Sequence, residues 1–120
     1  MNSKKITMVS EKRYELEEIK NRIVKESDRC SSLCIGIRHE IKRNYDDVKT
    51  LTLVFDRHSM RINGYVTLVI SLSEYKGIQY ADLVAAGGKE LIFDPKVEEE
   101  FLRWASNYLL KIDFKYQENC

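Results

Sequence analysis

Proline and glycine are scarce in this chain, with one proline and five glycines among 120 residues. Collagen-like, low-complexity and linker-rich sequences need far more of both residues, so these classes are excluded. We find no internal repeat, and the length fits one domain over residues 1–120. Within it we expect an ordered core over about residues 4–112 and a frayed, polar tail over 113–120.

An excess of either charge is also missing, because twenty lysines and arginines stand against nineteen aspartates and glutamates, a net charge of +1. Proteins that bind nucleic acids or anionic membranes usually carry a basic excess, so we predict neither partner. The chain lacks the run of about 20 apolar residues that a membrane-spanning helix requires. The apolar run after Lys4-Lys5 is too short for a signal-peptide core, which predicts a cytoplasmic protein.

Cysteine and histidine are few. The three cysteines, Cys30, Cys34 and Cys120, are an odd number, which favours free thiols over a disulfide framework. If the segment between them is extended, Cys30 and Cys34 lie about 13 Å apart, too far for a disulfide bond. A redox role for this pair stays open. A zinc site with His39 as third ligand needs a second ligand pair that the sequence lacks, so we predict no metal and no cofactor.

Hydrophobic periodicity predicts a short strand and then a helix in the first quarter of the chain. Residues 4–9 are β-prone and predict an edge strand. Ser10 stands where a helix N-cap would. Apolar residues then recur at helical spacing, at Leu16, Ile19 and Ile23. The pattern predicts an amphipathic helix of about sixteen residues that ends near Ser27-Asp28.

From Ser31 onward the hydrophobic period changes to two, as in half-buried strands. One face of the predicted strands holds Leu33, Ile35, Ile37, His39 and Ile41, then Leu51, Leu53 and Phe55, then Val66, Leu68, Ile70 and Leu72. Turn residues separate the segments at Asn44-Tyr45-Asp46-Asp47, at Asn63-Gly64, which predicts a type I′ hairpin, and at Lys76-Gly77. The next strand spans 78–86 and ends at Gly87-Gly88, and residues 91–93 are a candidate for a last short strand.

A second helix begins at Asp94-Pro95, with aspartate as N-cap and proline at the first helical position. Its apolar face holds Val97, Phe101, Trp104, Tyr108 and Ile112. The order β-α-β-β-β-β-(β)-α predicts an α+β fold. In it, an antiparallel meander sheet of four to five strands carries an N-terminal and a C-terminal helix on one face.

The sequence offers no recognisable catalytic constellation. Asp56-Arg57-His58-Ser59 contains the residue types of a catalytic triad, but neighbours on a strand alternate faces, so Ser59 does not share a side with Asp56 and His58. Residues 85–90 lack the glycine and hydroxyl of a phosphate loop. We therefore predict no catalytic residues and a non-enzymatic protein.

Asp82 leaves two interpretations of the strand over 78–86. Ala81, Leu83 and Ala85 face the helices in the one that we favour, whereas the other turns Asp82 toward them and gives it a raised pKa or a specific partner. A curved meander around a C-terminal helix rich in Phe101, Trp104 and Tyr108 is compatible with an apolar pocket between the layers. The alternative function is therefore the binding of a small molecule or lipid-like ligand in a cavity between the sheet and this helix. The candidate ligand-binding residues are Tyr80, Asp82, Trp104 and His39.

The sheet face opposite the helices is apolar for a surface that meets solvent. It holds Thr52, Val54, Tyr65, Thr67 and Val69. Such a face commonly packs against another sheet, so our main hypothesis is a homodimer, or contact with another protein, through these residues. The function that follows is a homo-oligomerising protein-interaction module.

Several segments stand in an order that resembles a known family. They are residues 57–60, 63–70, 82–88, 93 and 98–101. Together they resemble a family of small bacterial proteins of unknown function, found mainly in low-GC Gram-positive organisms. The resemblance implies an α+β fold and a bacterial cytoplasmic origin, and it transfers no functional residue. By architecture the chain is also similar to a shortened helix-grip ligand-binding domain, although it lacks that fold's second short helix and full strand count.

Overall fold

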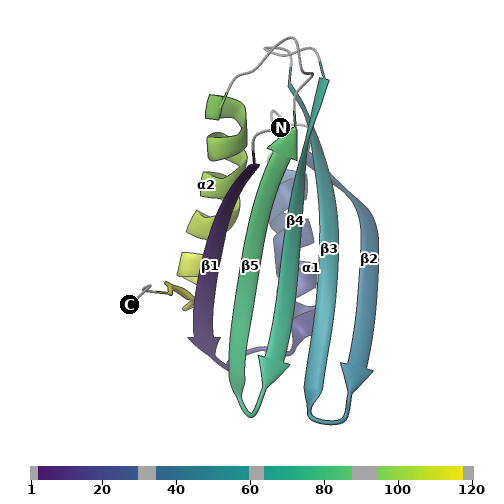
Figure 1. Ribbon diagram of the computed structural model, residues 1–120, viewed down its shortest axis with the longest axis vertical. Coiled ribbons are helices and arrows are strands. Elements are labelled where there is room, and N and C mark those ends of the chain that lie inside the picture. The colour runs from purple at the N-terminus through teal and green to yellow at the C-terminus, as the bar shows by residue number, and fades with distance from the viewer. Residues whose placement is uncertain (1–2, 30–34, 60–63, 88–94, 118–120) are drawn as a thin grey trace.

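An antiparallel sheet with a helix from each end of the chain forms the structure, a computed structural model that describes residues 3–29, 35–59, 64–87 and 95–117 (Figure 1). The elements are β1 (Ser3–Glu11), α1 (Leu16–Arg29), β2 (Ile35–Tyr45), β3 (Val48–Ser59), β4 (Gly64–Tyr75), β5 (Ile78–Gly87), α2 (Pro95–Lys111) and β6 (Lys115–Tyr116). The α+β prediction is confirmed, with six strands where four to five were expected. The three cysteines, Asp94 and the candidate strand over 91–93 lie outside the described residues.

The sheet has the strand order β2-β3-β4-β5-β1-β6 and is antiparallel throughout. Strands β2 to β5 form the predicted meander. Lys76 and Gly77 both have positive φ, 49° and 80°, as the type I′ turn between β4 and β5 requires. Asp46-Asp47 connects β2 to β3. The hairpin of β3 and β4 pairs Ser59 with Gly64, so Gly64 belongs to β4 and the prediction of a two-residue turn at Asn63-Gly64 is wrong. The connecting residues 60–63 lie outside the described ones.

The first strand is longer than expected, which corrects the start of the first helix. Ser10 pairs with Gln79 of β5 and is buried, so it continues β1 instead of capping a helix. The backbone N–H of Lys12 still donates to the carbonyl of Gly77 at 2.8 Å. Pairing with β5 therefore holds the chain extended through Glu11, and the helix begins only at Leu16.

The hydrophobic core lies between one face of the sheet and the two helices. Helix α1 packs on β2, β3 and β4, and α2 packs on β5, β1 and β4. Phe55 of β3 and Phe101 of α2 are fully buried in this layer. Both rings contact Trp104. Ala81, Leu83 and Ala85 are fully buried here, which confirms the favoured interpretation of β5. Across the described residues, no helix is long and apolar enough to span a membrane.

A bulge in β2 overturns one prediction. Ile37 pairs with Phe55, but His39 pairs with Val54, so Arg38 is an extra residue in the strand. An insertion of one residue turns every later side chain to the opposite face. His39 and Ile41 therefore lie on the face away from the helices, exposed, and not beside Ile35 and Ile37 as predicted.

The same bulge turns Glu40 and Lys42 toward helix α1. Lys20 Nζ lies 3.0 Å from Glu40 Oε2, and Lys42 Nζ lies 3.5 Å from Glu17 Oε1. Hydrogen bonding to Glu40 and Glu17 raises the pKa of Lys20. The part of β2 after the bulge is therefore joined to α1 by two ion pairs.

Residues 113–117, the described part of the predicted frayed tail, pack against the rest of the chain. Phe114 is 2% exposed, and its backbone N–H donates to the carbonyl of Leu109 at 3.0 Å. Lys115 and Tyr116 form β6 against β1, and the Tyr116 hydroxyl donates to Ser106 Oγ at 3.2 Å. The aromatic residues of the segment account for this order, because they anchor it to β1 and α2.

Gly87 sits where β5 approaches the backbone of β4. A Cβ at this position would lie 2.8 Å from the Val66 Cα and 3.0 Å from the Tyr65 carbonyl oxygen. We expect Gly87→Ala to lower the free energy of unfolding by about 1–3 kcal/mol, because the two backbones must separate. Urea denaturation measures this. Gly36→Ala is the matched control, since a Cβ there meets nothing within 4 Å, and an equal loss in both variants would contradict the steric explanation.

Candidate functional site

The face of the sheet that lies away from the helices is open, and in Figure 1 it is turned to the viewer, with α1 behind it. Cross-strand pairing arranges its side chains in transverse rows. One row places three half-buried valines side by side, Val54, Val69 and Val84, with Val54 next to His39 and Val84 next to Lys5. The next row is polar except at Ile41 on β2, and in it the Thr7 hydroxyl donates to Asp82 Oδ1 at 2.8 Å. An apolar centre therefore lies within a hydroxyl-rich surface.

A second apolar row crosses the open face beside the two hairpin turns. It consists of Tyr45, Val48, Tyr75 and Ile78, which are consecutive neighbours across four strands and between 36% and 63% exposed. Sequence reasoning missed this row. The signal was present, because a two-residue hairpin pairs its flanking residues on one face, and each turn has a tyrosine before it and a β-branched residue after it.

Charged groups on the open face divide into paired and unpaired ones. Arg38 Nε lies 3.3 Å from Asp56 Oδ2, and the Thr67 hydroxyl donates to Asp56 Oδ1 at 3.1 Å. Within the described part of the chain, Arg43 on β2 and Glu11 on β1 form no ion pair. Arg43 and Glu11 have opposite charge and lie near opposite edges of the open face, and Lys5 on β1 likewise forms no ion pair among the described residues.

The long edge of the sheet is poorly suited to pairing with another strand. Strand β2 is interrupted by the Arg38 bulge and also carries Glu40, Lys42 and Arg43. Bulges and charges of this kind protect edge strands from pairing. At the other edge, β6 covers β1 at Met8 and Val9.

All five predicted interface residues lie on the open face. Thr52, Val54, Tyr65, Thr67 and Val69 belong to β3 and β4, and Val54 pairs directly with Val69. The side chains on these strands alternate as the sequence pattern predicted, so the leucines, isoleucines and valines of the core face are buried behind them.

The four predicted ligand-binding residues do not come together. Tyr80 and Asp82 lie on the open face, because they alternate with the buried Ala81 and Leu83, and the bulge places His39 on the same face. Trp104 lies on the other side of the sheet, with its ring centroid 6.4 Å from that of Phe55. The sheet itself separates Trp104 from the other three, so they cannot line one cavity between the sheet and α2.

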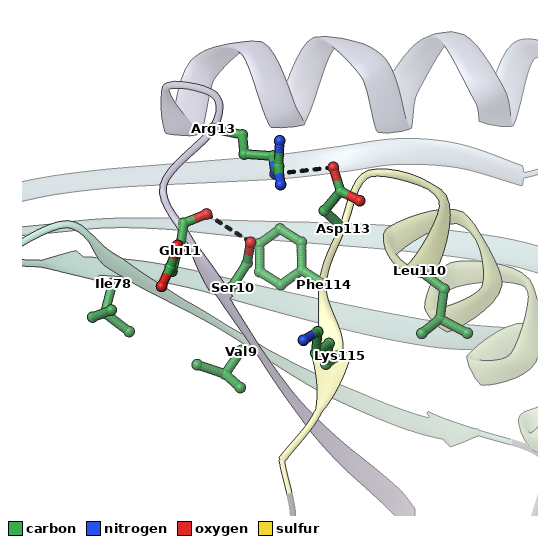
Figure 2. A pocket seen from close by; sticks show the side chains of 9 residues that line it. All are labelled: Val9, Ser10, Glu11, Arg13, Ile78, Leu110, Asp113, Phe114 and Lys115. Atoms are coloured by element: carbon green, nitrogen blue, oxygen red, sulfur yellow. Dashed lines mark hydrogen bonds and ion pairs between the residues drawn. The ribbon is translucent and has the colours of Figure 1, made fainter.

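A cavity of about 500 Å³ lies instead at the edge of the sheet, between the end of β1, β6 and the end of α2 (Figure 2). Its lining combines apolar and charged side chains: Val9, Ser10, Glu11, Arg13, Ile78, Leu110, Asp113, Phe114 and Lys115. Arg13 and Asp113 already pair at 3.0 Å. Because Val9 and Ile78 pair with residues of the open-face rows, the cavity continues that face toward α2.

The segment that resembles a triad has structural contacts. Asp56 bonds to Arg38 and Thr67, and the His58 ring packs edge-on against Tyr65 at 5.2 Å between centroids. Arg57 points the other way, with its guanidinium 3.4 Å from Glu100 on α2. Over residues 3–29, 35–59, 64–87 and 95–117, no three histidines, cysteines or carboxylates gather as a metal site would require.

A buried polar cluster joins the β4–β5 turn to the connection between β1 and α1. Gln79 Nε2 donates to Glu74 Oε1 at 2.8 Å and to the Tyr14 carbonyl at 2.7 Å. Lys12 Nζ lies 3.0 Å from Glu74 Oε2 and 2.9 Å from Glu15 Oε1. Burial raises the pKa of the Glu74 carboxyl, but the hydrogen bonds from Gln79 and Lys12 outweigh it and hold that pKa below its ordinary 4.5. Satisfied bonds of this kind make the cluster a structural clamp.

Comparison with known proteins agrees with the resemblance seen in the sequence. A family described as a family of unknown function (DUF6054) matches residues 1–113, which is nearly the whole chain. No curated protein matches the chain. The match spans both helices, the five long strands and therefore the entire open face. The chain belongs to the family of unknown function DUF6054.

Proposed function

We propose that this protein is a non-enzymatic interaction module that forms a homodimer by packing the open faces of two sheets against each other. The observation that carries the proposal is the open face itself. It presents the row Val54, Val69 and Val84 and the exposed row that runs from Tyr45 to Ile78. Packing these rows against a second sheet removes apolar surface from water, which is the main driving force of association.

The size of the face fits a stable dimer. Five strands spaced about 4.8 Å apart, each contributing about nine residues that rise 3.3 Å, give a face of roughly 700 Å². Stable interfaces bury about 800 Å² on each partner. Serine and threonine occupy many positions between the apolar rows, and their small side chains let two sheets approach to the usual spacing of about 10 Å.

A face-to-face dimer is favoured over an edge-to-edge one. The bulge and the charges of β2 oppose strand pairing at that edge, and β6 covers part of β1. In the part of the chain that the structure describes, the valine row at the centre of the open face carries no bulge and no charged side chain between Val54 and Val84.

Val69→Lys tests the proposal, because Val69 is the middle residue of the valine row. A lysine there points into solvent in the monomer but is buried between two sheets in the dimer. We expect the dimer dissociation constant to rise at least about 100-fold, since an unpaired charge is costly to bury. Sedimentation velocity across micromolar concentrations measures the dissociation constant.

Asn107→Lys is the matched control. Asn107 is an exposed residue of α2, so this substitution adds the same charge at a position away from the open face. It should leave the dissociation constant unchanged. A monomeric wild type at these concentrations, or a Val69→Lys dimer as tight as the wild type, would contradict the proposal. Native mass spectrometry of protein from its own host reports the mass and any bound ligand together.

A further inference from the structure

We infer that the two-fold axis of the dimer runs parallel to β4, so that Arg43 of one copy pairs with Glu11 of the other. This inference rests on the proposed function, which supplies the face-to-face contact. It adds the orientation of the second copy and the polar groups that select it.

Symmetry limits how two identical sheets can face each other. Among the five long strands, β4 is central, with β2 and β3 on one side and β5 and β1 on the other. An axis parallel to β4 keeps each transverse row at its own height and exchanges the two sides. Strand β2 then lies over β1 of the second copy, and β3 lies over β5.

This orientation matches apolar side chains row by row. Val54 on β3 lies over Val84 on β5 of the second copy, because both belong to the valine row. Val48 lies over Ile78 in the row beside the turns, and the two copies of Tyr75 meet at the axis. Sheets packed in this way keep their strands nearly aligned, which is one of the two common arrangements of stacked sheets.

The charges select the same orientation. Arg43 lies in the row of Thr50, Ser73, Tyr80 and Val9, so in the dimer it meets the second copy's β1 at Val9. Glu11 is the next outward-facing residue along β1, well within the reach of an arginine side chain. Arg43 and Glu11 make no ion pair within the described chain, so each can pair across the interface.

The other simple axis runs across the strands, and the positions of the apolar rows disfavour it. It would place β2 over β2 of the second copy with the rows reversed. The row from Tyr45 to Ile78 would then face the opposite end of the second sheet and not its own counterpart.

A charge-reversal cycle tests the inference. Arg43 and Glu11 are exposed residues near opposite edges of the open face. Neither substitution should therefore affect folding, and the midpoint of unfolding checks this. We expect Arg43→Glu and Glu11→Arg each to raise the dimer dissociation constant about tenfold, because each faces a like charge. The double variant should recover most of the loss. Recovery requires contact between two copies, because the residues cannot meet within one chain.

Site-directed cross-linking supplies a second readout. In a background with Cys30, Cys34 and Cys120 changed to serine, Ser73→Cys lies on β4 and should cross-link to its own copy through a short bismaleimide. Ile41→Cys lies on β2, far from the axis, and should not. Cross-linking of Ile41→Cys but not Ser73→Cys would establish the perpendicular axis instead.

The outcomes separate the two proposals. A monomeric wild type would contradict both the face-to-face dimer and the proposed orientation of its axis. A dimer that is unaffected by Arg43→Glu, or a double variant that does not recover, overturns the orientation and leaves the face-to-face dimer standing. Lys25→Glu, an exposed charge reversal on α1, is the control and should leave the dissociation constant unchanged.

Discussion

Phe55→Ala is expected to lower the free energy of unfolding by about 3–5 kcal/mol, the range for a fully buried phenylalanine. Phe55 has no exposed surface, pairs with Ile37 and Leu68, and meets Trp104 edge-on. Its removal leaves a cavity between β3 and α2 that neighbours on two rigid elements cannot fill. Urea denaturation gives the free energy, and the fluorescence of Trp104, the only tryptophan, reports the same transition locally.

Leu110→Ala is the control for this variant. Leu110 lies on the outer side of α2 and is 40% exposed, so its truncation removes little buried surface and should change the free energy by less than about 1 kcal/mol. A Phe55→Ala variant no less stable than Leu110→Ala would mean that the layer between sheet and helices relaxes freely and is not the close-packed core described above.

Glu74→Ala should lower the free energy of unfolding by about 2 kcal/mol at neutral pH, the second large effect that we expect. The carboxylate accepts hydrogen bonds from Gln79 and Lys12, and its removal leaves the buried Gln79 amide without one partner. Chemical denaturation at pH 7 measures the loss. Glu15→Ala is the matched control, because Glu15 also bonds to Lys12 but its side chain is 63% exposed, and its loss should stay below about 0.5 kcal/mol.

The difference between wild type and Glu74→Ala should depend on pH in a definite direction. Hydrogen bonds hold the pKa of Glu74 in the folded chain below its ordinary 4.5. The folded state therefore binds the proton less well than the unfolded state, and the stabilisation is complete above pH 4.5. It is lost as the pH falls through the lowered pKa. A difference that grows on acidification would contradict the assigned role of the carboxylate.

Local patterns predicted much of the fold because the forces that determine it are local. The alternation of β3 and β4 follows from side chains that must face either the core or solvent. The turn at Lys76-Gly77 was signalled by Gly77, because glycine adopts the positive φ of such turns without steric cost. Pro95 begins α2 as predicted, since its missing N–H is unneeded at the first helical position.

Long-range pairing explains what the sequence pattern did not reveal. Ser10 has the chemistry of a helix cap, but β5 draws it into the sheet. The Arg38 bulge has no local signal, because charged residues occupy both faces around it, and it alone moved His39 and Ile41 to the open face. The two-residue strand β6 was missed because it forms only against β1.

The candidate site was predicted in part for the same reason. Thr52, Val54, Tyr65, Thr67 and Val69 follow directly from strand alternation, which depends on neighbours in sequence. The predicted ligand-binding set joined residues of three elements and depended on knowing which face each presented. Because Ala81 and Ala85 of β5 face the core, Asp82 faces the open side of the sheet, whereas Trp104 lies on the core side.

The position of β1 between β5 and β6 constrains the order of folding. Strands β2 to β5 can pair through successive hairpins, each closing a short loop, whereas Ser3 must find Ala86 across most of the chain. During synthesis β1 emerges from the ribosome before β5, so it has no partner strand until β5 has also emerged. Strand β6 emerges after both. Until β1 docks, β5 is an open edge, so the period before docking is when the nascent chain is most vulnerable to pairing with another molecule.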